Sequence, residues 1–452
     1  MRFFTALSLF ISGAAIASAL PSSSETVEAN CVKPYLCCGE LKTPLDSTLD
    51  PILLDLGIDA ASIVGSVGLL CHAWDETCET GPKCCTEANL LSVWNRLNSI
   101  LTNNATDILE FAKELTASGL IPSKALTCLN GYAIIDLNSI HRHNPSPENL
   151  SIYPYKAKSD APYSIAENTL RAAIHIPRSF SHKRDKKIPV LLVPGTAVPA
   201  AITFYFNFGK LRRALPESEL VWIDLPQASL DDIQLSAEYV AYALNYVSAL
   251  TSSKIAVISW SQGALDIQWA LKYWPSTRSV VNDFIAISPD FHGTIVKWLQ
   301  GWDANFIQAL RSQGGDSAYV PTTTIYSSFD KIVRPMSGEN ASARLLDYRG
   351  VGVSNNHLQT ICANNAAGGL YTHEGVLYNP LAWALTVDAL LHDGPSNITR
   401  IDTQKICEQV LPPYLELTDM LGTEALLLVA LAKILTYSPK VSGEPDIAKY
   451  AY

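Results

Sequence analysis

Ser261 has the sequence surroundings that best fit a catalytic nucleophile. It lies in Ser259-Trp260-Ser261-Gln262-Gly263, with a small residue two positions before it and another two positions after it. This spacing is typical of a nucleophile elbow, a strand-to-helix turn so sharp that larger side chains would collide with the flanking elements. The pattern predicts that Ser261 is a nucleophile. The simpler interpretation is a serine in an ordinary loop between a strand and a helix.

A serine nucleophile needs a histidine base and an acid that orients the histidine, and after an elbow of this kind the acid precedes the histidine in the chain. Asp330 directly follows a strand-like segment and is the predicted acid. Two downstream histidines, His357 and His373, lie in turn-rich segments that suit a base, and spacing alone leaves both open. His292 follows a predicted strand end too closely, and His392 follows a helical run.

The negative charge that develops during attack on a carbonyl group needs two hydrogen-bond donors. One is the backbone N–H of the residue after the nucleophile, here Gln262. The second comes from a loop after an early strand, and Pro194-Gly195-Thr196 is a loop of that kind. Thr196 can offer both its N–H and its hydroxyl group. The sequence therefore predicts an oxyanion hole made of Thr196 and Gln262.

Strands that alternate with helices must position these residues. Helical spacing is clear over 231–250, where Asp231 or Asp232 can cap the N-terminus, and again after Ser261, where Ala264, Ile267 and Leu271 share a face. The alternation predicts an α/β fold with a parallel sheet, whose ligands bind at the carboxyl ends of the strands. The predicted strands cover 188–193, 220–223, 255–258, 284–287 and 322–326.

Composition excludes several classes of function. The 452 residues are 48% hydrophobic and 17% charged, which is typical of a globular chain and not of a disordered one. The net charge of −10 leaves no basic footprint for nucleic acid. The longest apolar run beyond the N-terminus, 425–432, suits a buried helix and is too short for a span, so we expect no stable membrane insertion.

The first 19 residues are interpreted as a signal peptide. Arg2 precedes an apolar stretch over 3–17, and Ala17-Ser18-Ala19 has the small-x-small form of a cleavage site. We therefore expect a secreted protein, extracellular or associated with the cell wall. Four glycosylation sequons agree with secretion, at Asn104, Asn149, Asn340 and Asn397.

Cysteine and proline usage divides the rest of the chain. Eight of the 10 cysteines lie between Cys31 and Cys128, which predicts a small disulfide-rich domain over 20–138. A segment rich in Pro, Ser, Lys and Asn over 139–165 is interpreted as a linker. The catalytic domain is expected over 166–452.

Several motifs in this second part, taken together and in order, resemble the fungal lipase B family. They are 191–196, 260–263, 287–290, 320–323, 330–335, 373–375 and 444–446, and the resemblance spans about 186–451. It implies an α/β-hydrolase fold, activity on carboxylic esters, and neither a metal nor a cofactor.

The same resemblance implies roles for individual residues. It makes Ser261 the nucleophile, Asp330 the acid and His373 the base, and so favours His373 over His357. It implies an oxyanion hole at Thr196 and Gln262 and a disulfide between Cys362 and Cys407. Substrate-pocket positions are implied at Trp260, Asp290 and Ile332.

The cysteine order of the first part, single, pair, single, single, pair, single, resembles the hydrophobin framework of fungi over about 31–130. By that resemblance the bridges are Cys31–Cys84, Cys37–Cys78, Cys38–Cys71 and Cys85–Cys128. Cysteine count alone allows 105 connectivities for eight cysteines. A disulfide-stapled prodomain or lid without surface activity is the alternative.

The whole pattern predicts a secreted serine lipase or esterase that acts through an acyl-enzyme on lipid or other ester substrates at an oil–water interface. Two alternatives remain open. One is an acyltransferase that uses the same three residues, and the other is a surface-active coat protein with a vestigial hydrolase domain.

Overall fold

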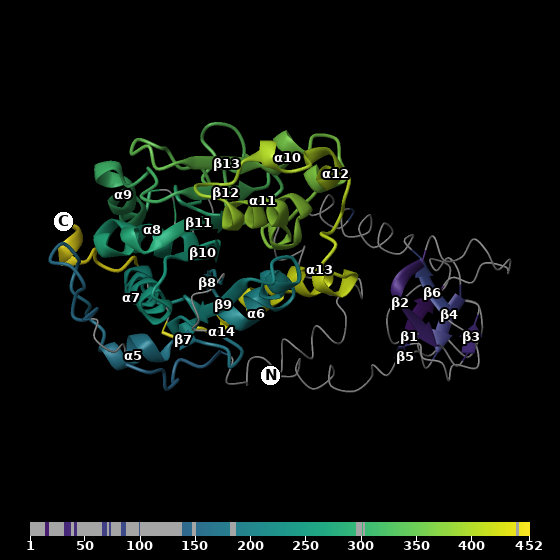
Figure 1. Cartoon of the computed structure of the whole chain (residues 1–452), viewed down its shortest axis with the longest axis horizontal. Helices are drawn as coiled ribbons and strands as arrows, with labels where there is room; N and C mark the ends of the chain where they lie inside the picture. The colour runs from purple at the N-terminus through teal and green to yellow at the C-terminus, as the bar shows by residue number, and fades with distance from the viewer. Residues whose placement is uncertain are drawn as a thin grey trace. The chain divides into compact units, whose positions relative to one another are not determined.

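The computed structural model describes residues 138–146, 151–180, 187–294, 301, 303–439 and 443–452, together with Ser99 and the backbone of six short strands between 14 and 86. The chain forms two compact units, Met1–Ser123 and Lys124–Tyr452 (Figure 1). Each unit is described by itself.

The N-terminal unit contains two small antiparallel sheets, with strand orders β1-β4-β3 and β5-β2-β6. β1 lies within the segment interpreted as a signal peptide, so a chain cleaved after Ala19 would lack this strand. The cysteine side chains of this unit, and with them the four implied bridges, lie outside the described residues. The strands are β1 (Ala14–Ala17), β2 (Cys31–Cys37), β3 (Glu40–Lys42), β4 (Ser66–Leu69), β5 (His72–Ala73) and β6 (Lys83–Thr86).

The C-terminal unit is built on a seven-stranded sheet in the order β13-β12-β11-β10-β8-β9-β7. All neighbouring strands run parallel except β7, which pairs antiparallel with β9. Each of the five predicted strands is present, and the predicted α/β class is confirmed. The strands are β7 (Ile174–His175), β8 (Ile188–Val193), β9 (Ser218–Ile223), β10 (Ile255–Trp260), β11 (Val281–Ile287), β12 (Thr322–Tyr326) and β13 (Val353–His357).

The two edge strands were not expected from the sequence. β13 reads Val-Ser-Asn-Asn-His, with none of the apolar character of the central strands. Only Asn356 of this strand is buried, and its side-chain amide donates to the Thr324 carbonyl of β12. An edge strand needs fewer apolar side chains because one of its sides is open, so the search for apolar runs passes over it.

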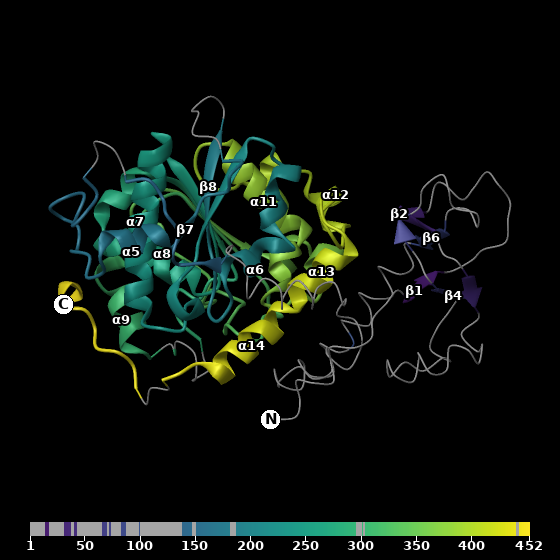
Figure 2. The same cartoon turned by 90° about the horizontal axis from the view of Figure 1, so that it is seen from below.

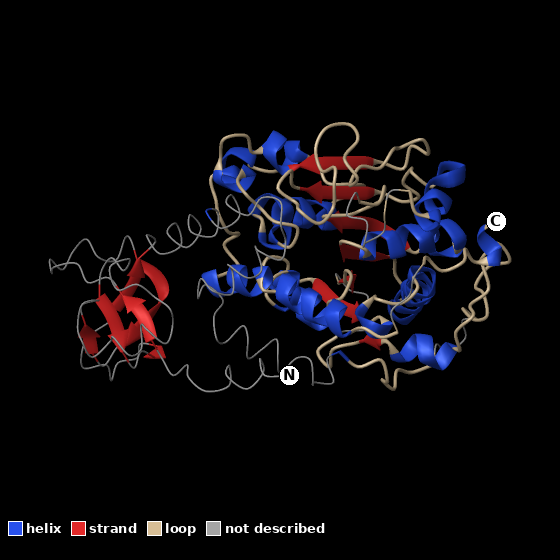
Figure 3. Ribbon diagram, turned by 180° about the vertical axis from the view of Figure 1, so that it is seen from behind, coloured by secondary structure: helices blue, strands red, loops and turns tan. Residues whose placement is uncertain are grey.

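Helices cover both faces of the sheet (Figures 2 and 3). α7 and α8 lie side by side on one face, and α6 and α11 lie on the other (Figure 2). Asp232 caps α7, accepting a hydrogen bond from the Gln234 N–H at 2.9 Å. The helix α7 runs over Ile233–Thr251, which agrees closely with the predicted helix over 231–250. The other helices are α5 (Glu167–Ala172), α6 (Ala200–Tyr205), α8 (Gly263–Tyr273), α9 (Asn305–Arg311), α10 (Leu358–Ile361), α11 (Pro380–Leu391), α12 (Thr403–Cys407), α13 (Leu417–Glu424) and α14 (Leu426–Thr436).

The structure also bears on two predictions from the sequence, one about a disulfide and one about membrane spans. A disulfide joins Cys362, at the end of α10, to Cys407 of α12, the pair implied by the lipase B resemblance. Within the described part of the chain, no helix has both the length and the apolar character that crossing a membrane requires.

The segment 139–165 differs from the linker that its composition suggested. Its described residues, 139–146 and 151–165, have little regular structure but pack on the α7–α8 layer: Ile152 and Tyr163 are buried, and the Tyr163 ring stacks on Trp274 with centroids 5.7 Å apart. The Ala161 N–H also donates to the Tyr273 carbonyl at 2.8 Å. A high proline and serine content thus marked an irregular backbone, while the scattered aromatic and aliphatic side chains decided that it is packed.

An ion pair also binds this segment to the sheet. The Arg142 guanidinium lies 3.0 Å from the carboxylate of Asp224, which follows β9 and is 3% exposed. Burial raises the pKa of Asp224 to about 7, and the nearby Arg142 opposes that shift. Arg142 therefore stabilises the ionised form of a carboxyl group that burial disfavours.

Replacing Arg142 with Met should lower the free energy of unfolding by about 3 kcal/mol at pH 8, because Asp224 is left buried without its cationic partner. Denaturant titration of the purified protein measures this change.

The matched control is Arg344→Met. Arg344 pairs with Glu339 at 2.9 Å, but Glu339 is 88% exposed, so this loss should cost less than about 0.5 kcal/mol. Equal changes in the two variants would contradict a stabilising role for the buried pair.

Candidate active site

Ser261 occupies a sharp turn between β10 and α8. Its φ is 55°, a backbone conformation that is costly for a residue with a side chain, and its N–H donates to the Ile287 carbonyl at 3.0 Å. A Cβ atom on Gly263 would lie 2.7 Å from the Val193 carbonyl oxygen, and one on Gly195 would lie 2.8 Å from the Ser261 Cβ. The turn closes only because these two positions lack side chains, which is the geometry of a nucleophile elbow.

The structure brings His373 to Asp330. The His373 Nδ1 lies 2.6 Å from one carboxylate oxygen of Asp330, and both side chains are buried. The other carboxylate oxygen accepts the backbone N–H groups of Ile332 and Val333, each at 2.8 Å. The carboxylate is thus held by its own loop at one oxygen and orients the imidazole with the other.

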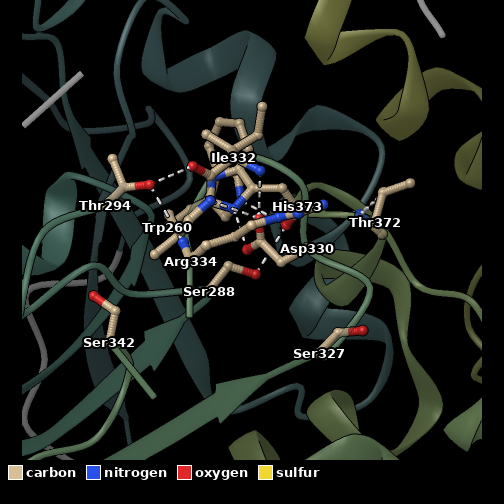
Figure 4. Close-up of polar contacts among 12 residues, drawn as sticks. Trp260, Ser288, Thr294, Ser327, Asp330, Ile332, Arg334, Ser342, Thr372 and His373 are labelled. Carbon is tan, nitrogen blue, oxygen red and sulfur yellow. Dashed lines mark hydrogen bonds and ion pairs between the residues drawn. The ribbon is translucent and has the colours of Figure 1, made fainter. Parts of the chain in front are cut away.

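Two donors hold the backbone of His373 against the ends of neighbouring strands (Figure 4). Its carbonyl accepts Trp260 Nε1–H at 3.1 Å and the Ser288 hydroxyl at 2.9 Å. The Trp260 and His373 ring centroids are 5.1 Å apart. Trp260 immediately precedes Ser261, so these contacts bring the imidazole to the elbow. Within the described residues, no hydrogen bond joins the Ser261 hydroxyl to His373.

The two predicted oxyanion donors are also neighbours. The Thr196 hydroxyl donates to Gln262 Oε1, and Gln262 Nε2 donates to the Ser229 carbonyl at 3.1 Å. The Thr196 N–H has no partner among the groups that the structure describes. Gln262 immediately precedes α8, so the positive end of that helix dipole also faces this region. The arrangement can stabilise an anion beside Ser261.

The other histidines have different partners. His357 ends β13, where its Nε2 lies 2.6 Å from the Ser328 hydroxyl and its Nδ1 lies 2.7 Å from the Thr360 hydroxyl. His292 is largely buried, which lowers its pKa to about 4. His392 pairs with Asp388 at 3.2 Å. None of these three is bonded to Asp330 in the described part of the chain.

Buried acids lie close to His373. Asp290 is 4% exposed, and burial raises its pKa to about 7, while the charge of nearby His373 opposes the shift. Ile332, also implied as a pocket position, is partly buried, and its carbonyl accepts the Thr294 hydroxyl at 2.8 Å (Figure 4).

Several residues of this region were not identified from the sequence. Ser288 follows β11 and donates to the His373 carbonyl. Its position, as a polar residue at the carboxyl end of a strand, is the sequence feature that could have identified it. Asp266 is fully buried near Asp290, and burial with that neighbouring charge raises its pKa well above its usual range. It is a single acid within a helix that is otherwise buried, and such an isolated charge was the only signal for it.

Two of the four predicted glycosylation sites can be located. Asn340 and Asn397 are both exposed, as an acceptor asparagine must be. The Asn397 side chain accepts the Thr399 N–H at 2.9 Å. Asn104 and Asn149 lie outside the described residues. Among the residues that are described, no cluster of three His, Cys, Asp or Glu side chains has the arrangement of a metal site.

Known proteins resemble the two parts of the chain separately. No protein-family model matches the chain. The crystal structure of Aspergillus fumigatus lipase B is 59% identical to it, with a TM-score of 0.79, over 80% of this chain and 90% of that one. Lipase B of Pseudozyma antarctica is 29% identical over 310 residues, which are 65% of this chain and 87% of that protein. The 80% share is larger than residues 166–452, so the similarity extends N-terminal of residue 166.

The N-terminal part matches a different protein. The class I hydrophobin dewE of Emericella nidulans is 63% identical over 94 residues, which are 20% of this chain and 86% of that protein. Both resemblances predicted from the sequence are therefore confirmed. The chain belongs to the lipase B family of lipase- and esterase-type α/β-hydrolases, and its N-terminal region belongs to the hydrophobins.

Proposed function

We propose that the protein is a secreted serine lipase that hydrolyses carboxylic ester bonds of lipids, with Ser261, His373 and Asp330 as its catalytic residues. The observation that carries the proposal is the oriented imidazole. One carboxylate oxygen of Asp330 lies 2.6 Å from His373 Nδ1, and two backbone N–H groups bind the other oxygen. This contact lies at the carboxyl ends of the strands, where Ser261 also lies. This is the relation between acid and base that a serine nucleophile requires.

In the proposed reaction the Ser261 hydroxyl attacks the ester carbonyl and its proton passes to His373 Nε2. Asp330 keeps the proton of His373 on Nδ1 and stabilises the imidazolium that forms. The N–H groups of Thr196 and Gln262 stabilise the oxyanion, and the Thr196 hydroxyl joins them by turning its proton from Gln262 Oε1 to the oxyanion. The imidazolium then protonates the leaving alcohol, which leaves an acyl-enzyme. Water, deprotonated by His373, then attacks the acyl carbonyl. The bond to the Ser261 oxygen breaks, the imidazolium returns its proton to that oxygen, and the carboxylic acid leaves.

Action at an oil–water interface is the second part of the proposal. Long-chain esters collect at such boundaries, and the hydrophobin-like region is a compact unit separate from the hydrolase. A region that adsorbs to the boundary would raise the effective concentration of the active site there. The apolar helix α14 supports contact with an apolar substrate, because its side chains after Leu427 are only partly buried or exposed and Leu435 is 77% exposed. The signal-like segment 1–19 supports secretion.

Replacing Ser261 with Ala should lower kcat/KM for p-nitrophenyl butyrate by ~10⁵-fold, because the nucleophile is lost. Asp330→Asn should lower it by ~10⁴-fold, since the amide favours the wrong imidazole tautomer.

The matched control for this pair is the second serine–histidine contact, tested by Ser328→Ala and His357→Gln. These variants should keep wild-type kcat/KM on the same ester. Activity that survives Ser261→Ala, or that disappears in His357→Gln, would contradict the assignment. Triolein hydrolysis and acyl transfer to an added alcohol, measured on the same preparations, separate lipase, esterase and acyltransferase activity.

The Thr196 hydroxyl should contribute to kcat and not to KM, because the negative charge it stabilises exists only in the transition state. Thr196→Val is expected to lower kcat on p-nitrophenyl butyrate by about 100-fold. Thr196→Ser retains a hydroxyl and should recover most of that loss. A rise in KM at constant kcat would instead indicate that Thr196 binds the ground state.

Deleting residues 20–123, so that the second compact unit follows the signal segment, tests the interface proposal. Hydrolysis of dissolved p-nitrophenyl butyrate should be unchanged, while the rate on emulsified triolein should fall by about tenfold or more. Adding the N-terminal unit back as a separate chain is the control for tethering. Equal losses on both substrates, or no loss on either, would refute the proposal.

A further inference from the structure

Two glutamates form a buried pair next to the histidine turn, the segment 372–378 that carries His373. Glu374 immediately follows His373, and Glu424 is the last residue of α13. Both are buried, at 3% and 0% exposure. Among the described residues, neither forms an ion pair with a Lys, Arg or His side chain. Buried carboxyl groups without a cation are costly, so their retention needs an explanation.

Glu424 accepts hydrogen bonds from two hydroxyl groups of the histidine turn. The Tyr378 hydroxyl donates to Glu424 Oε1 at 2.6 Å. The Thr372 hydroxyl lies 3.0 and 3.1 Å from the two carboxylate oxygens. The same Thr372 oxygen accepts the Gly375 N–H at 2.7 Å. One carboxylate of α13 therefore holds residues on both sides of His373.

The turn closes tightly around this carboxylate. A Cβ atom on Gly375 would lie 2.8 Å from the Thr372 hydroxyl oxygen and 3.0 Å from Glu424 Oε1. A side chain at this position would push the turn away from α13. The close fit means that the position of the Glu424 carboxylate and the shape of the turn depend on each other.

The charges of the pair agree with this arrangement. Burial and the neighbouring Glu424 raise the pKa of Glu374 well above its usual range, and burial raises the pKa of Glu424 to about 7. Glu374 Oε1 has no partner within the described residues, whereas Glu424 has two hydroxyl donors. Of the two, Glu424 is therefore the better placed to carry a negative charge. Asp330, Tyr371 and Tyr378 are the other titratable groups that interact with the pair.

We propose that Glu424 is a positioning residue for His373. From α13 it holds the Thr372 and Tyr378 hydroxyls, and with them the turn that presents the imidazole to Ser261. The strand ends hold the same turn from another direction, through Trp260 and Ser288 at the His373 carbonyl (Figure 4). The proposal rests on the proposed function, because it takes His373 as the catalytic base.

The test compares kcat and KM on p-nitrophenyl butyrate for Glu424→Leu and Glu424→Gln. The leucine variant frees both hydroxyls, and kcat should fall by about 100-fold at unchanged KM, as expected for a misplaced base. The glutamine variant keeps one acceptor oxygen and should stay within about tenfold of wild-type kcat. Wild-type kcat in Glu424→Leu, or a fall in kcat/KM that lies wholly in KM, would overturn the proposal.

Hydroxyl deletions keep the test decisive if Glu424→Leu does not fold. Thr372→Val and Tyr378→Phe each remove one donor and should each lower kcat by several-fold. The matched control is Tyr371→Phe, one residue before the histidine turn, because the Tyr371 hydroxyl donates at 2.7 Å to the Val410 carbonyl and not to Glu424. It should lower the melting temperature and leave kcat unchanged. Equal effects of Tyr371→Phe and Tyr378→Phe on kcat would reduce Glu424 to a structural role.

Ser261→Ala, measured beside these variants, separates the two ways of failing. If Ser261→Ala retains activity, the proposed function fails, and the Glu424 proposal fails with it. If Ser261→Ala is inactive while the Glu424 variants have wild-type kcat, only the positioning role is refuted.

Discussion

The turn at Ser261 is the constraint on which the rest of the site depends. Ser261 has a φ of 55° and lies between a buried strand and a buried helix. This conformation is stable only where the neighbouring segments of the chain leave room for the turn. Gly195 and Gly263 provide that room, and a Cβ atom on either would meet atoms less than 3.0 Å away. The loop after β8 thereby approaches the elbow closely enough for Thr196 to contact Gln262. The positions of the proposed nucleophile and of the proposed oxyanion donors therefore follow from one packing requirement.

A second requirement concerns the histidine turn: His373 lies in a loop, yet it must be held as firmly as a residue of a strand. The side chains of Trp260 and Ser288 at two strand ends, the Asp330 carboxylate and the Glu424 carboxylate all bind residues of 372–378. Two of these four contacts involve buried carboxyl groups, which are costly to bury without hydrogen-bond donors. A fixed orientation of His373 is what this arrangement gains for the free-energy cost of burying the carboxylates.

The similarity of the chain to two families has a structural counterpart in its two compact units. The hydrolase unit begins well before the first strand that carries a lipase-like motif. Ile152 and Tyr163, from the irregular segment 139–165, pack on the α7–α8 layer and so belong to this unit. Its ion pair between Arg142 and Asp224 adds an electrostatic contact at the end of β9. The lipase-like unit therefore includes chain that composition alone assigns to a linker.

The amino-acid sequence by itself determined the local features of this protein. Short, mostly apolar β-rich runs predicted the five inner strands, and the small residues around Ser261 predicted the elbow, because both depend on neighbours in the chain. Spacing left His357 and His373 open, and the resemblance to lipase B chose between them. Only the tertiary structure decided that Asp330 meets His373 and that Ser328 meets His357, since each pair joins residues far apart in sequence. The same holds for Glu424, whose partners lie about 50 positions away and whose sequence neighbours are those of any apolar helix.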